Sequence, residues 1–375
     1  MSKKTIVGID LGTTNSVISY FKNGKAQVIP NQEGENTTPS VVAFANGEWL
    51  VGTIAQRQAI TNPTNTIYAS KRFMGQKYSD VKAIAEQMPF KVEPDVNGNA
   101  VFNIDGKQIT PEEIASKVLL KLKKAAEAFL GEEITECVVT CPAYFSQNSR
   151  AGVANAATIS GLKTLRIINE PTASILCYPA DKDISKKILC WDLGGATFDC
   201  SILEMGNDVC EVISTSGLYV GGEDFDRTII NQMADDFKKE TGIDLTKDKM
   251  ALQRLKIEAE RAKKELSQVS EVEVNIPFIT ADANGPKHLL QKITKAKFEN
   301  LIGALVDKTF ICLEQAIKDS KLKHSEIDDI VFVGGSTRIP MILDRIKALF
   351  NKEPLRSVNV DAAVSLAAAI QAGIL

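Results

Sequence analysis

One short pattern occurs twice in this sequence. It begins at residue 3 as "KKTIVGIDLGTTNSVISYF" and at residue 186 as "KKILCWDLGGATFDCSILEM", and each copy contains an apolar strand, an aspartate, a glycine turn and a second strand. The two aspartates, Asp10 and Asp192, stand 192 − 10 = 182 residues apart, about half of the 375-residue chain. A repeat of this length predicts two similar lobes, because the units of solenoid proteins are only ~20–50 residues long.

Chain length, composition and charge fit a globular protein with more than one core. A single core seldom exceeds ~250–300 residues, so a chain of 375 residues is expected to divide. Hydrophobic residues make up 44% and charged residues 24%, which is usual for soluble proteins. The net charge of −3 argues against a nucleic-acid partner. The apolar stretch "AAVSLAAAIQAGIL" is shorter than the ~18–20 residues of a membrane span, so we expect no membrane partner.

Cysteine and histidine usage indicates a reducing compartment and no zinc site. The seven cysteines include no Cys-x-x-Cys pair, and most lie in apolar runs, so we expect reduced core cysteines. His288 and His324 are far apart and in polar surroundings, which argues against a histidine-based zinc site or nucleophile. The start "MSKKTIVGID" leaves no room for a signal peptide. We expect a cytoplasmic protein, or one of an organelle matrix if a transit peptide has been removed.

Local signals predict the elements around the two copies of the repeat. Thr110, Pro111 and Glu113 predict a capped helix that ends at Gly131. The other elements predicted in the first half are hairpin turns at Asn23-Gly24 and Asn46-Gly47, a strand at 133–142, a helix at 146–161, a strand at 165–169 and a helix from Glu170. In the second half, residues 223–325 are mostly helical apart from the alternating "EVEVNI", and we interpret them as an insertion subdomain.

Glycine turns after buried strands indicate where phosphate would bind. Glycine lets backbone N–H groups approach a phosphate and form a nest around it. The turns "DLGTTN" at 10–15 and "DLGGATFD" at 192–199 would hold a polyphosphate from both lobes. Either turn alone could be an ordinary hairpin. The occurrence of two such turns half a chain apart favours phosphate binding. A third turn, "VGGSTRIP" at 333–340, either meets an anion or covers an adenosine, or is a plain connection capped by Ser336.

Carboxylates beside these turns predict a cation. Asp10, Asp192 and Asp199 would repel a phosphate unless a cation lay between them. Mg²⁺ prefers oxygen ligands in octahedral geometry, keeps several waters and commonly bridges carboxylates to substrate phosphates. A nucleotide bound with Mg²⁺ is therefore the ligand that both features predict.

The motifs together resemble a known family. "GIDLGTTNS", "SKRFMG", "CPAYF", "INEPTAS", "DLGGATFD", "GGEDFD" and "VGGSTRIP" resemble, in order and spacing, the nucleotide-binding domain of the heat shock protein 70 chaperones over residues 4–375. "TNPTNTIYASKR", "MPFKV" and "ITADANGPKH" are similar to the DnaK-like branch. The resemblance implies an α/β, actin-like ATPase fold with two duplicated lobes, each on a mixed sheet of the five-stranded type, and four subdomains around a nucleotide cleft. Lobe I (subdomains IA and IB) would span 1–182 and lobe II (IIA and IIB) 183–375, with 223–325 as its mainly helical part.

The resemblance also implies a role for each matching residue. Lys71 would orient the attacking water and bind the γ-phosphate. The residues implied to hold hydrated Mg²⁺ are Asp10, Asp192, Glu170 and Asp199, and with Lys71 and Thr197 they form the catalytic set. The residues implied to bind phosphates are Gly12, Thr13, Thr14, Asn15, Gly194, Gly195, Ala196 and Thr197. The residues implied to contact adenosine are Glu260, Lys263 and Ser267, with Gly335, Ser336 and Arg338 over the base and Asp361 nearby. Gly221, Gly222, Lys264 and Gly334 are implied to bind the nucleotide as well.

Other interpretations of these residues stay open on the sequence alone. Lys71 could be an exposed lysine, and Asp361 could cap the last helix. Glu260 and Lys263 could form a solvated ion pair on one helix. Pro142 and Arg150 resemble the family's hinge proline and its downstream arginine, which transmit the nucleotide state to the rest of the chaperone.

The implied activity is a slow, Mg²⁺-dependent hydrolysis of ATP to ADP and phosphate. Water would attack the γ-phosphoryl group in line, through a loose transition state stabilised by Mg²⁺, Lys71 and backbone N–H groups. No strong general base is evident, which predicts the slow turnover of a conformational timer. The cofactors are then ATP or ADP and Mg²⁺, with K⁺ as a further cation.

The family likeness implies partners as well. We expect a J-domain co-chaperone and a nucleotide-exchange factor of GrpE type acting on a monomer. Family members continue past the segment "AAIQAGIL" into a peptide-binding domain, which we expect to be absent from this chain. Two alternatives stay open: a sugar or acetate kinase of the actin-like superfamily, which needs a phosphoryl acceptor, and an actin-like filament protein.

A few positions depart from the family pattern. Ala196 replaces a glycine of the second phosphate turn and Ala367 replaces another glycine, while Cys177 and Pro179 replace alanine and glycine. A methyl group at a residue with positive φ would cost ~1 kcal/mol. With an ordinary φ, the alanine would cost little and could stiffen the turn. We predict that nucleotide binding is retained, and the effect of these residues on the hydrolysis rate stays open on the sequence alone.

Overall fold

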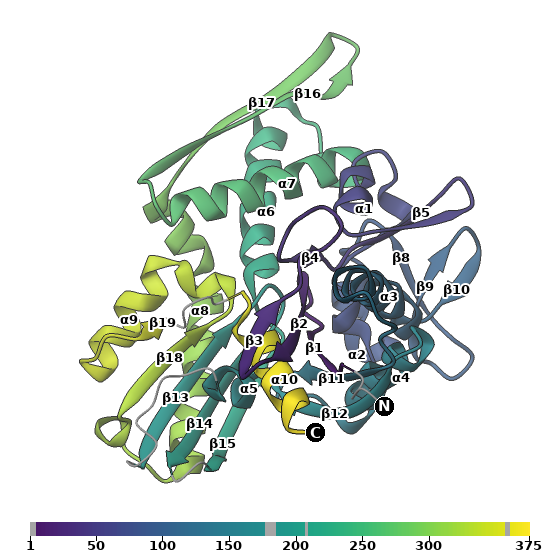
Figure 1. Ribbon diagram of the computed structural model, residues 1–375. Helices are drawn as coiled ribbons and strands as arrows, with labels where there is room; N and C mark the ends of the chain where they lie inside the picture. The colour runs from purple at the N-terminus through teal and green to yellow at the C-terminus, as the bar shows by residue number, and fades with distance from the viewer. Residues whose placement is uncertain (1–4, 177–184, 207–208, 357–360) are drawn as a thin grey trace.

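Two β-sheets, one in each half of the chain, lie next to each other in the lower part of Figure 1. The computed structural model describes residues 5–176, 185–206, 209–356 and 361–375. Cys177 and Pro179 lie outside the described residues.

The first sheet has the strand order β12-β11-β1-β2-β3, with β4 as a further strand on β2. β1 is antiparallel to β2 and parallel to β11. β2 is antiparallel to β3, and β11 is parallel to β12. The strand bounds are β1 (Val7–Asp10), β2 (Asn15–Lys22), β3 (Lys25–Val28), β4 (Thr38–Pro39), β11 (Glu136–Cys141) and β12 (Lys163–Asn169).

The second sheet repeats this arrangement as β15-β14-β13-β18-β19. β13 is antiparallel to β14 and parallel to β18, β14 is antiparallel to β15, and β18 is parallel to β19. Asp10 pairs with Val17, and Asp192 pairs with Asp199 at the corresponding place. The predicted duplication is therefore confirmed strand for strand. The bounds are β13 (Lys186–Leu193), β14 (Phe198–Gly206), β15 (Val209–Leu218), β18 (Asp329–Val333) and β19 (Leu355–Arg356).

A helix follows the last strand of each sheet. α5 (Glu170–Leu176) begins after β12, and α10 (Ala363–Ile374) begins beyond β19. α10 packs on β1, β2, β3 and β11 and touches α5. A Cβ at Gly8 of β1 would lie 2.1 Å from the amide nitrogen of Ala369, so only glycine allows this approach. The division at residue 182 assigned α10 to lobe II, whereas the helix lies on the sheet of lobe I, because its small apolar face fits there.

Local signals placed several elements correctly. α3 (Pro111–Leu130) has the predicted capping box, with Glu113 N–H donating to Thr110 Oγ1 and Thr110 N–H donating to Glu113 Oε2. It ends at Gly131, whose φ is 71°. Both Asn-Gly turns have positive φ at each residue and join antiparallel strands, as predicted.

The rest of lobe I lies mainly to the right of the first sheet in Figure 1, where it is coloured from purple to blue. A small sheet of β6, β5 and β7 and another of β10, β9 and β8 lie there. The bounds are β5 (Val42–Ala45), β6 (Glu48–Val51), α1 (Thr53–Gln58), η1 (Pro63–Asn65), β7 (Thr66–Ile67), η2 (Ser70–Phe73), α2 (Tyr78–Ala85), β8 (Lys91–Pro94), β9 (Ala100–Ile104), β10 (Lys107–Ile109) and α4 (Gln147–Ile159).

The predicted insertion of lobe II is helical with one long hairpin, which stands at the top of Figure 1. Its elements are α6 (Gly222–Thr241), η3 (Leu245–Lys247), α7 (Lys249–Leu266), β16 (Glu271–Asp282), β17 (Gly285–Thr294) and α8 (Lys295–Ser320). α8 packs on β14 and β15, so this helix covers the second sheet and does not stand apart from it. The chain ends through η4 (His324–Glu326), η5 (Gly335–Arg338), α9 (Pro340–Phe350) and α10.

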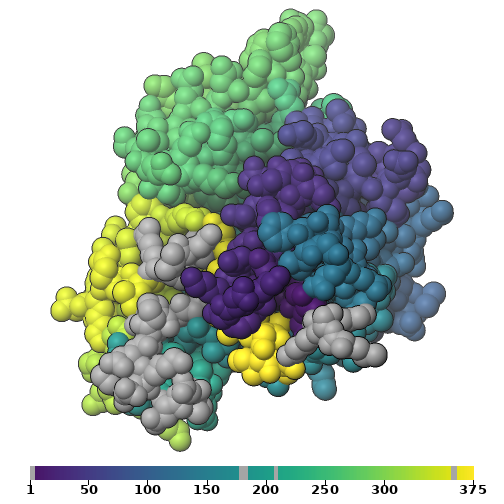
Figure 2. Space-filling view, viewed as in Figure 1, coloured from purple at the N-terminus to yellow at the C-terminus, as the bar shows by residue number. Residues whose placement is uncertain are grey.

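Each lobe has its own main hydrophobic core. Trp191, Phe198 and Phe225 are buried in lobe II, and Phe73 and Phe102 are buried in lobe I. The two lobes meet above the sheets, where Figure 2 shows the green residues of the insertion beside the purple residues of lobe I. None of the helices in the described part of the chain is long and apolar enough to cross a membrane.

Candidate functional site

A cavity of about 930 Å³ lies between the two lobes. The ends of β1 and β13 form its base, while α6, α7 and η5 supply one side. The predicted site residues that line it are Asp10, Gly12, Thr13, Thr14, Asn15, Lys71, Glu170, Asp192, Gly194, Gly195, Thr197, Gly222, Glu260, Lys263, Lys264, Ser267, Gly334, Gly335, Ser336, Arg338 and Asp361. Three predicted site residues, Ala196, Asp199 and Gly221, lie outside this lining.

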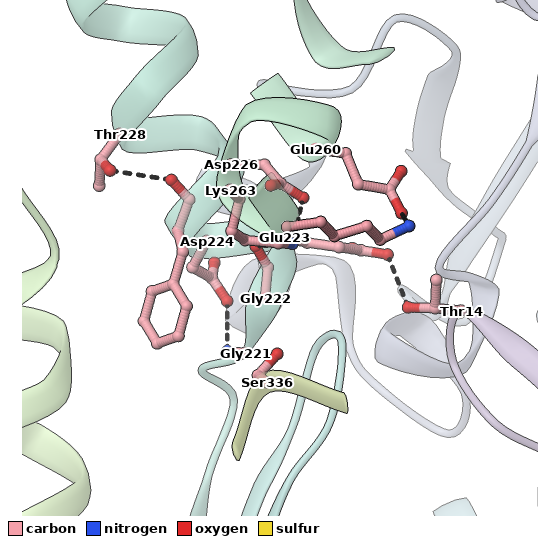
Figure 3. A network of polar contacts seen from close by, with 12 residues as sticks. Thr14, Gly221, Gly222, Glu223, Asp224, Asp226, Thr228, Glu260, Lys263 and Ser336 are labelled. Atoms are coloured by element: carbon pink, nitrogen blue, oxygen red, sulfur yellow. Dashed lines mark hydrogen bonds and ion pairs between the residues drawn. The ribbon is translucent and has the colours of Figure 1, made fainter. Parts of the chain in front are cut away.

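The first two glycine turns touch each other at the base of the cavity. A Cβ on Gly195 would lie 1.9 Å from Thr14 Oγ1, so only glycine allows the two turns to meet. Thr14 Oγ1 also donates to Glu223 Oε1 at 3.4 Å, across the gap that Figure 3 shows. Gly222 N–H donates to Gly194 O at 3.0 Å and ties the start of α6 to the second turn.

The third glycine turn is fixed against the second. Ser336 Oγ donates to Gly194 O at 2.9 Å. Gly334 has a φ of +83°, and a Cβ there would lie 2.4 Å from Leu193 O, so the position requires glycine. Neither η5 nor α9 has a side-chain cap. The interpretation of Ser336 as a helix cap is therefore wrong, because its hydroxyl is used in the contact between turns.

Lys71 is buried beside the two turns, with 5% of its side chain exposed. The interpretation as a surface lysine is therefore wrong. Lys71 Nζ donates to Glu170 Oε1 at 2.7 Å. Burial lowers the pKa of Lys71, but the charges of Glu170 and Asp10 outweigh burial and raise it. Ala69, at the entry to η2, has a φ of 53°, a left-handed conformation that is uncommon without glycine.

Asp10 and Asp192 present carboxyl groups at the base of the cavity, where Asp192 is buried and Asp10 is half-buried. Burial and the charge of Glu170 raise the pKa of Asp10 to about 7, although Lys71 acts in the opposite direction. Burial and Glu170 also raise the pKa of Asp192 well above its usual range. Carboxyl groups in this state gain strongly from a nearby cation, because a positive charge stabilises their ionised form.

Asp199 acts behind the cavity. Its carboxylate accepts a hydrogen bond from Ala143 N–H at 2.6 Å and another from Thr215 Oγ1 at 3.2 Å. Burial raises the pKa of Asp199 to about 7, while the Ala143 bond lowers it. Asp199 therefore ties the second sheet to the Pro142 turn of lobe I, and the structure does not bring it into the cavity lining.

Ala196 also lies behind the lining. Its side chain is fully buried and its φ is not positive, so the alanine causes no backbone strain. Its carbonyl accepts a hydrogen bond from Arg72 Nη2 at 3.1 Å. Gly221 packs against Ala196, since a Cβ on Gly221 would lie 2.5 Å from Ala196 N.

Lys263 is held at the start of α6, as Figure 3 shows. Its Nζ donates to Gly222 O at 2.9 Å and to Asp226 Oδ2 at 2.8 Å. Glu260 pairs with Lys264 at 2.6 Å. The predicted pair of Glu260 and Lys263 is therefore replaced by two others, because Asp226 of α6 faces Lys263.

Arg338 and Asp361 close the far end of the cavity. Arg338 Nη2 lies 3.0 Å from Asp361 Oδ2, and about half of each side chain is exposed. The residue at the N-cap position of α10 is Ala362, and the role of Asp361 as a cap of this helix stays a prediction. The ion pair joins η5 to the segment just before α10.

A comparison with protein families gives a match over nearly the whole chain. The model of the family described as "Hsp70 protein" matches residues 6–375. The chain belongs to the Hsp70 family. Hsp70 proteins are chaperones that bind and hydrolyse ATP, and the two duplicated α/β lobes are those of their actin-like ATPase fold. The matched residues therefore constitute a chaperone ATPase domain.

Other residues that line the cavity of this Hsp70 domain were not predicted from the sequence. Glu223 and Asp226 belong to the quoted motif "GGEDFD", and their position near the start of α6 was a usable signal. Ser40, Tyr68 and Lys256 carry no such local signal, because only the fold brings their segments to the cavity. The missed lining residues are Val17, Thr37, Ser40, Val41, Gln56, Ala59, Tyr68, Glu223, Asp226, Gln253, Lys256, Ile257, Gln268, Val333, Ile339 and Val364.

The segment matched to the Hsp70 hinge is held by one arginine. Arg150 Nε donates to Phe145 O at 3.1 Å, and its Nη2 donates to Pro142 O at 3.3 Å and to Ala143 O at 2.8 Å. Asp199 binds the N–H group of the same Ala143. The turn is thus fixed from both lobes.

Proposed function

We propose that this domain binds Mg²⁺-ATP and Mg²⁺-ADP in the cavity and hydrolyses ATP slowly, as part of a DnaK-type chaperone. One observation carries the proposal: the two duplicated glycine turns touch each other in the same cavity that the carboxyl groups of Asp10 and Asp192 line. In the full-length protein, the nucleotide state would control peptide binding by a further domain.

The donor set fits Mg²⁺ surrounded by water. No three carboxylate, imidazole or thiol groups among the described residues converge closely enough to form a metal centre by themselves. Mg²⁺ usually keeps several waters and binds few carboxylates directly, so Asp10, Asp192 and Glu170 would hold it partly through its water ligands. Bound there, Mg²⁺ would neutralise the charge of the phosphates. Asp199 would support this group from behind, and K⁺ remains a prediction of the resemblance.

Lys71 would bind the γ-phosphate and orient the attacking water. Its ammonium group is fully charged and faces the cavity beside both turns. Glu170 is already occupied by Lys71, so it is a poor general base. Slow turnover follows, because positioning and charge stabilisation remain without efficient proton removal.

The residues of α7 and η5 would surround the adenosine. Glu260, Lys263 and Ser267 line one side of the cavity and Gly335 and Arg338 the other. We further propose a J-domain co-chaperone and a GrpE-type exchange factor as partners of a monomer in the cytosol or an organelle matrix. Free cysteines at all six described positions fit such a reducing compartment.

A calorimetric titration with ADP, repeated with EDTA, tests ligand and metal together. We expect tight binding with Mg²⁺ and much weaker binding after chelation. Phosphate release from ATP without any acceptor tests the reaction. Strong stimulation by a sugar or acetate would favour the kinase alternative, and sedimentation that grows with protein concentration in Mg²⁺-ATP would favour a filament protein.

A further inference from the structure

Ser40 binds two carbonyl groups of the first glycine turn. Its N–H group donates to Thr14 O at 2.8 Å, and its Oγ donates to Gly12 O at 2.7 Å. Ser40 comes from the loop after β4, is 5% exposed and lines the same cavity as the turn. The turn is therefore held from outside by one residue that no phosphate motif contains.

The direction of these two carbonyl groups fixes the direction of two N–H groups. In a trans peptide the C=O and the following N–H point in opposite directions. When Gly12 O and Thr14 O point toward Ser40, the N–H groups of Thr13 and Asn15 point away from it. We propose that Ser40 is a positioning residue that aims these N–H groups at the β- and γ-phosphates. The proposal rests on the proposed function, because it requires a phosphate in this turn.

A second serine, Ser16, forms a hydrogen bond with the hydroxyl group of Ser40. Ser16 Oγ lies 2.9 Å from Ser40 Oγ and is fully buried. Since the single hydroxyl hydrogen of Ser40 goes to Gly12 O, Ser16 donates to Ser40. The chain from Ser16 through Ser40 to Gly12 O runs in one direction, and such chains strengthen each bond in them.

The loop that carries Ser40 is itself fixed. Asn31 is buried, its Nδ2 donates to Thr37 O at 3.1 Å, and its Oδ1 accepts from the N–H groups of Glu33 and Glu35. β4 pairs with the start of β2, with Thr38 opposite Ser16. The loop that carries Ser40 is therefore held by contacts of its own, which do not depend on a ligand.

Glycine at position 12 makes this support necessary. A peptide next to glycine rotates easily, because no Cβ restricts it. A rotated peptide would present Gly12 O to a phosphate and repel it. The loss of Ser40 should therefore weaken the binding of phosphates specifically, and should leave the adenosine contacts of α7 and η5 unaffected.

The Ser40→Ala variant tests this by calorimetry with ATP, ADP, AMP and adenosine. One lost hydrogen bond of about 1 kcal/mol predicts roughly five- to tenfold weaker ADP and ATP binding. We expect unchanged adenosine and AMP binding, and near-normal ADP binding in Ser40→Thr, which keeps the hydroxyl. Ser116→Ala is the matched control, because Ser116 is also 5% exposed and bonds one carbonyl, Glu113 O, but in α3.

Each of the other possible results contradicts either the role of Ser40 or the proposed function. An equal loss for all four ligands, or no loss for ADP, overturns the positioning role of Ser40. A wild-type protein that binds none of the ligands overturns the proposed function itself. If Ser40→Ala does not fold, Ser16→Ala takes its place, with the same selective loss for ADP and ATP expected and an unselective effect contradicting the role.

Discussion

Arg72 of lobe I binds Asp224 of lobe II with both ends of its guanidinium group. Arg72 Nη2 lies 2.5 Å from Asp224 Oδ2, and Nη1 lies 3.3 Å from Oδ1. The same Nη2 also donates to Ala196 O at 3.1 Å, and Arg72 is only 2% exposed. Arg72 follows Lys71 directly, so this contact fixes the turn that carries Lys71 onto the second phosphate turn and α6.

Asp224→Asn should lower both stability and the hydrolysis rate. A hydrogen bond to a charged group is worth about 1.5–3 kcal/mol, and the variant leaves a buried guanidinium without its counter-ion. We expect a loss of this size in urea unfolding, together with slower single-turnover hydrolysis, because η2 is less firmly held. Asp235→Asn is the control, since Asp235 is an exposed carboxylate of the same helix. Equal effects of the two substitutions would contradict the coupling.

Lys71→Ala should reduce the rate of ATP hydrolysis far more than it reduces the affinity for ADP. Removing one preorganised donor to a developing charge typically costs a factor of about 10²–10³ in rate. Single-turnover measurements should show this loss, while ADP affinity measured by calorimetry changes far less. Lys82→Ala, at a lysine with 61% of its side chain exposed, should behave as wild type. Unchanged hydrolysis in Lys71→Ala would remove the catalytic assignment.

Ala196→Gly should destabilise the domain without speeding hydrolysis. The Ala196 side chain is fully buried and its φ is not positive, so the methyl group adds packing and restricts the unfolded chain. We expect a loss of about 1 kcal/mol in the free energy of unfolding. A glycine variant that hydrolyses ATP several times faster would show that the methyl group distorts the turn after all.

The structural features that could be predicted from the sequence are those that depend on neighbouring residues or on the internal repeat. The cap at Thr110, the end of α3 at Gly131 and the duplicated strands around Asp10 and Asp192 all follow from local or repeated patterns. The position of α10 on the lobe I sheet and the burial of Lys71 were not predictable in this way. Both depend on contacts between segments that are far apart in the chain.

Asp199 shows that contacts between distant segments were not predictable inside the site either. The sequence placed it beside the phosphate turn, and β14 does pair it with Asp192. Its carboxylate nevertheless binds Ala143 of the other lobe, which no pattern within "DLGGATFD" specifies. Ser40 is a comparable case, since its two bonds to the first turn depend on how the loop after β4 packs.

Asp226 should make stability depend on pH. Burial raises the pKa of Asp226 to about 6, although Lys263 lowers it, so the folded protein binds a proton that the unfolded chain releases near pH 4. This contribution is therefore present below about pH 4 and is lost as the pH rises through about 6. In urea unfolding, the stability of the wild type relative to Asp226→Asn should fall across that range and level off above pH 7. A difference that stays flat across this pH range would contradict the shift.

Trp191 should report magnesium and nucleotide through its fluorescence. It directly precedes Asp192, is fully buried, and its ring lies 4.6 Å from that of Phe198 and 5.0 Å from that of Phe310. The chain has two tryptophans, so Trp49→Phe leaves Trp191 as the only one. Mg²⁺-ADP should change its emission, because the bound cation changes the charge beside it, and EDTA should reverse the change. The Trp191→Phe variant, which keeps Trp49, should give no such response, and a signal that followed Trp49 would place the metal away from Asp192.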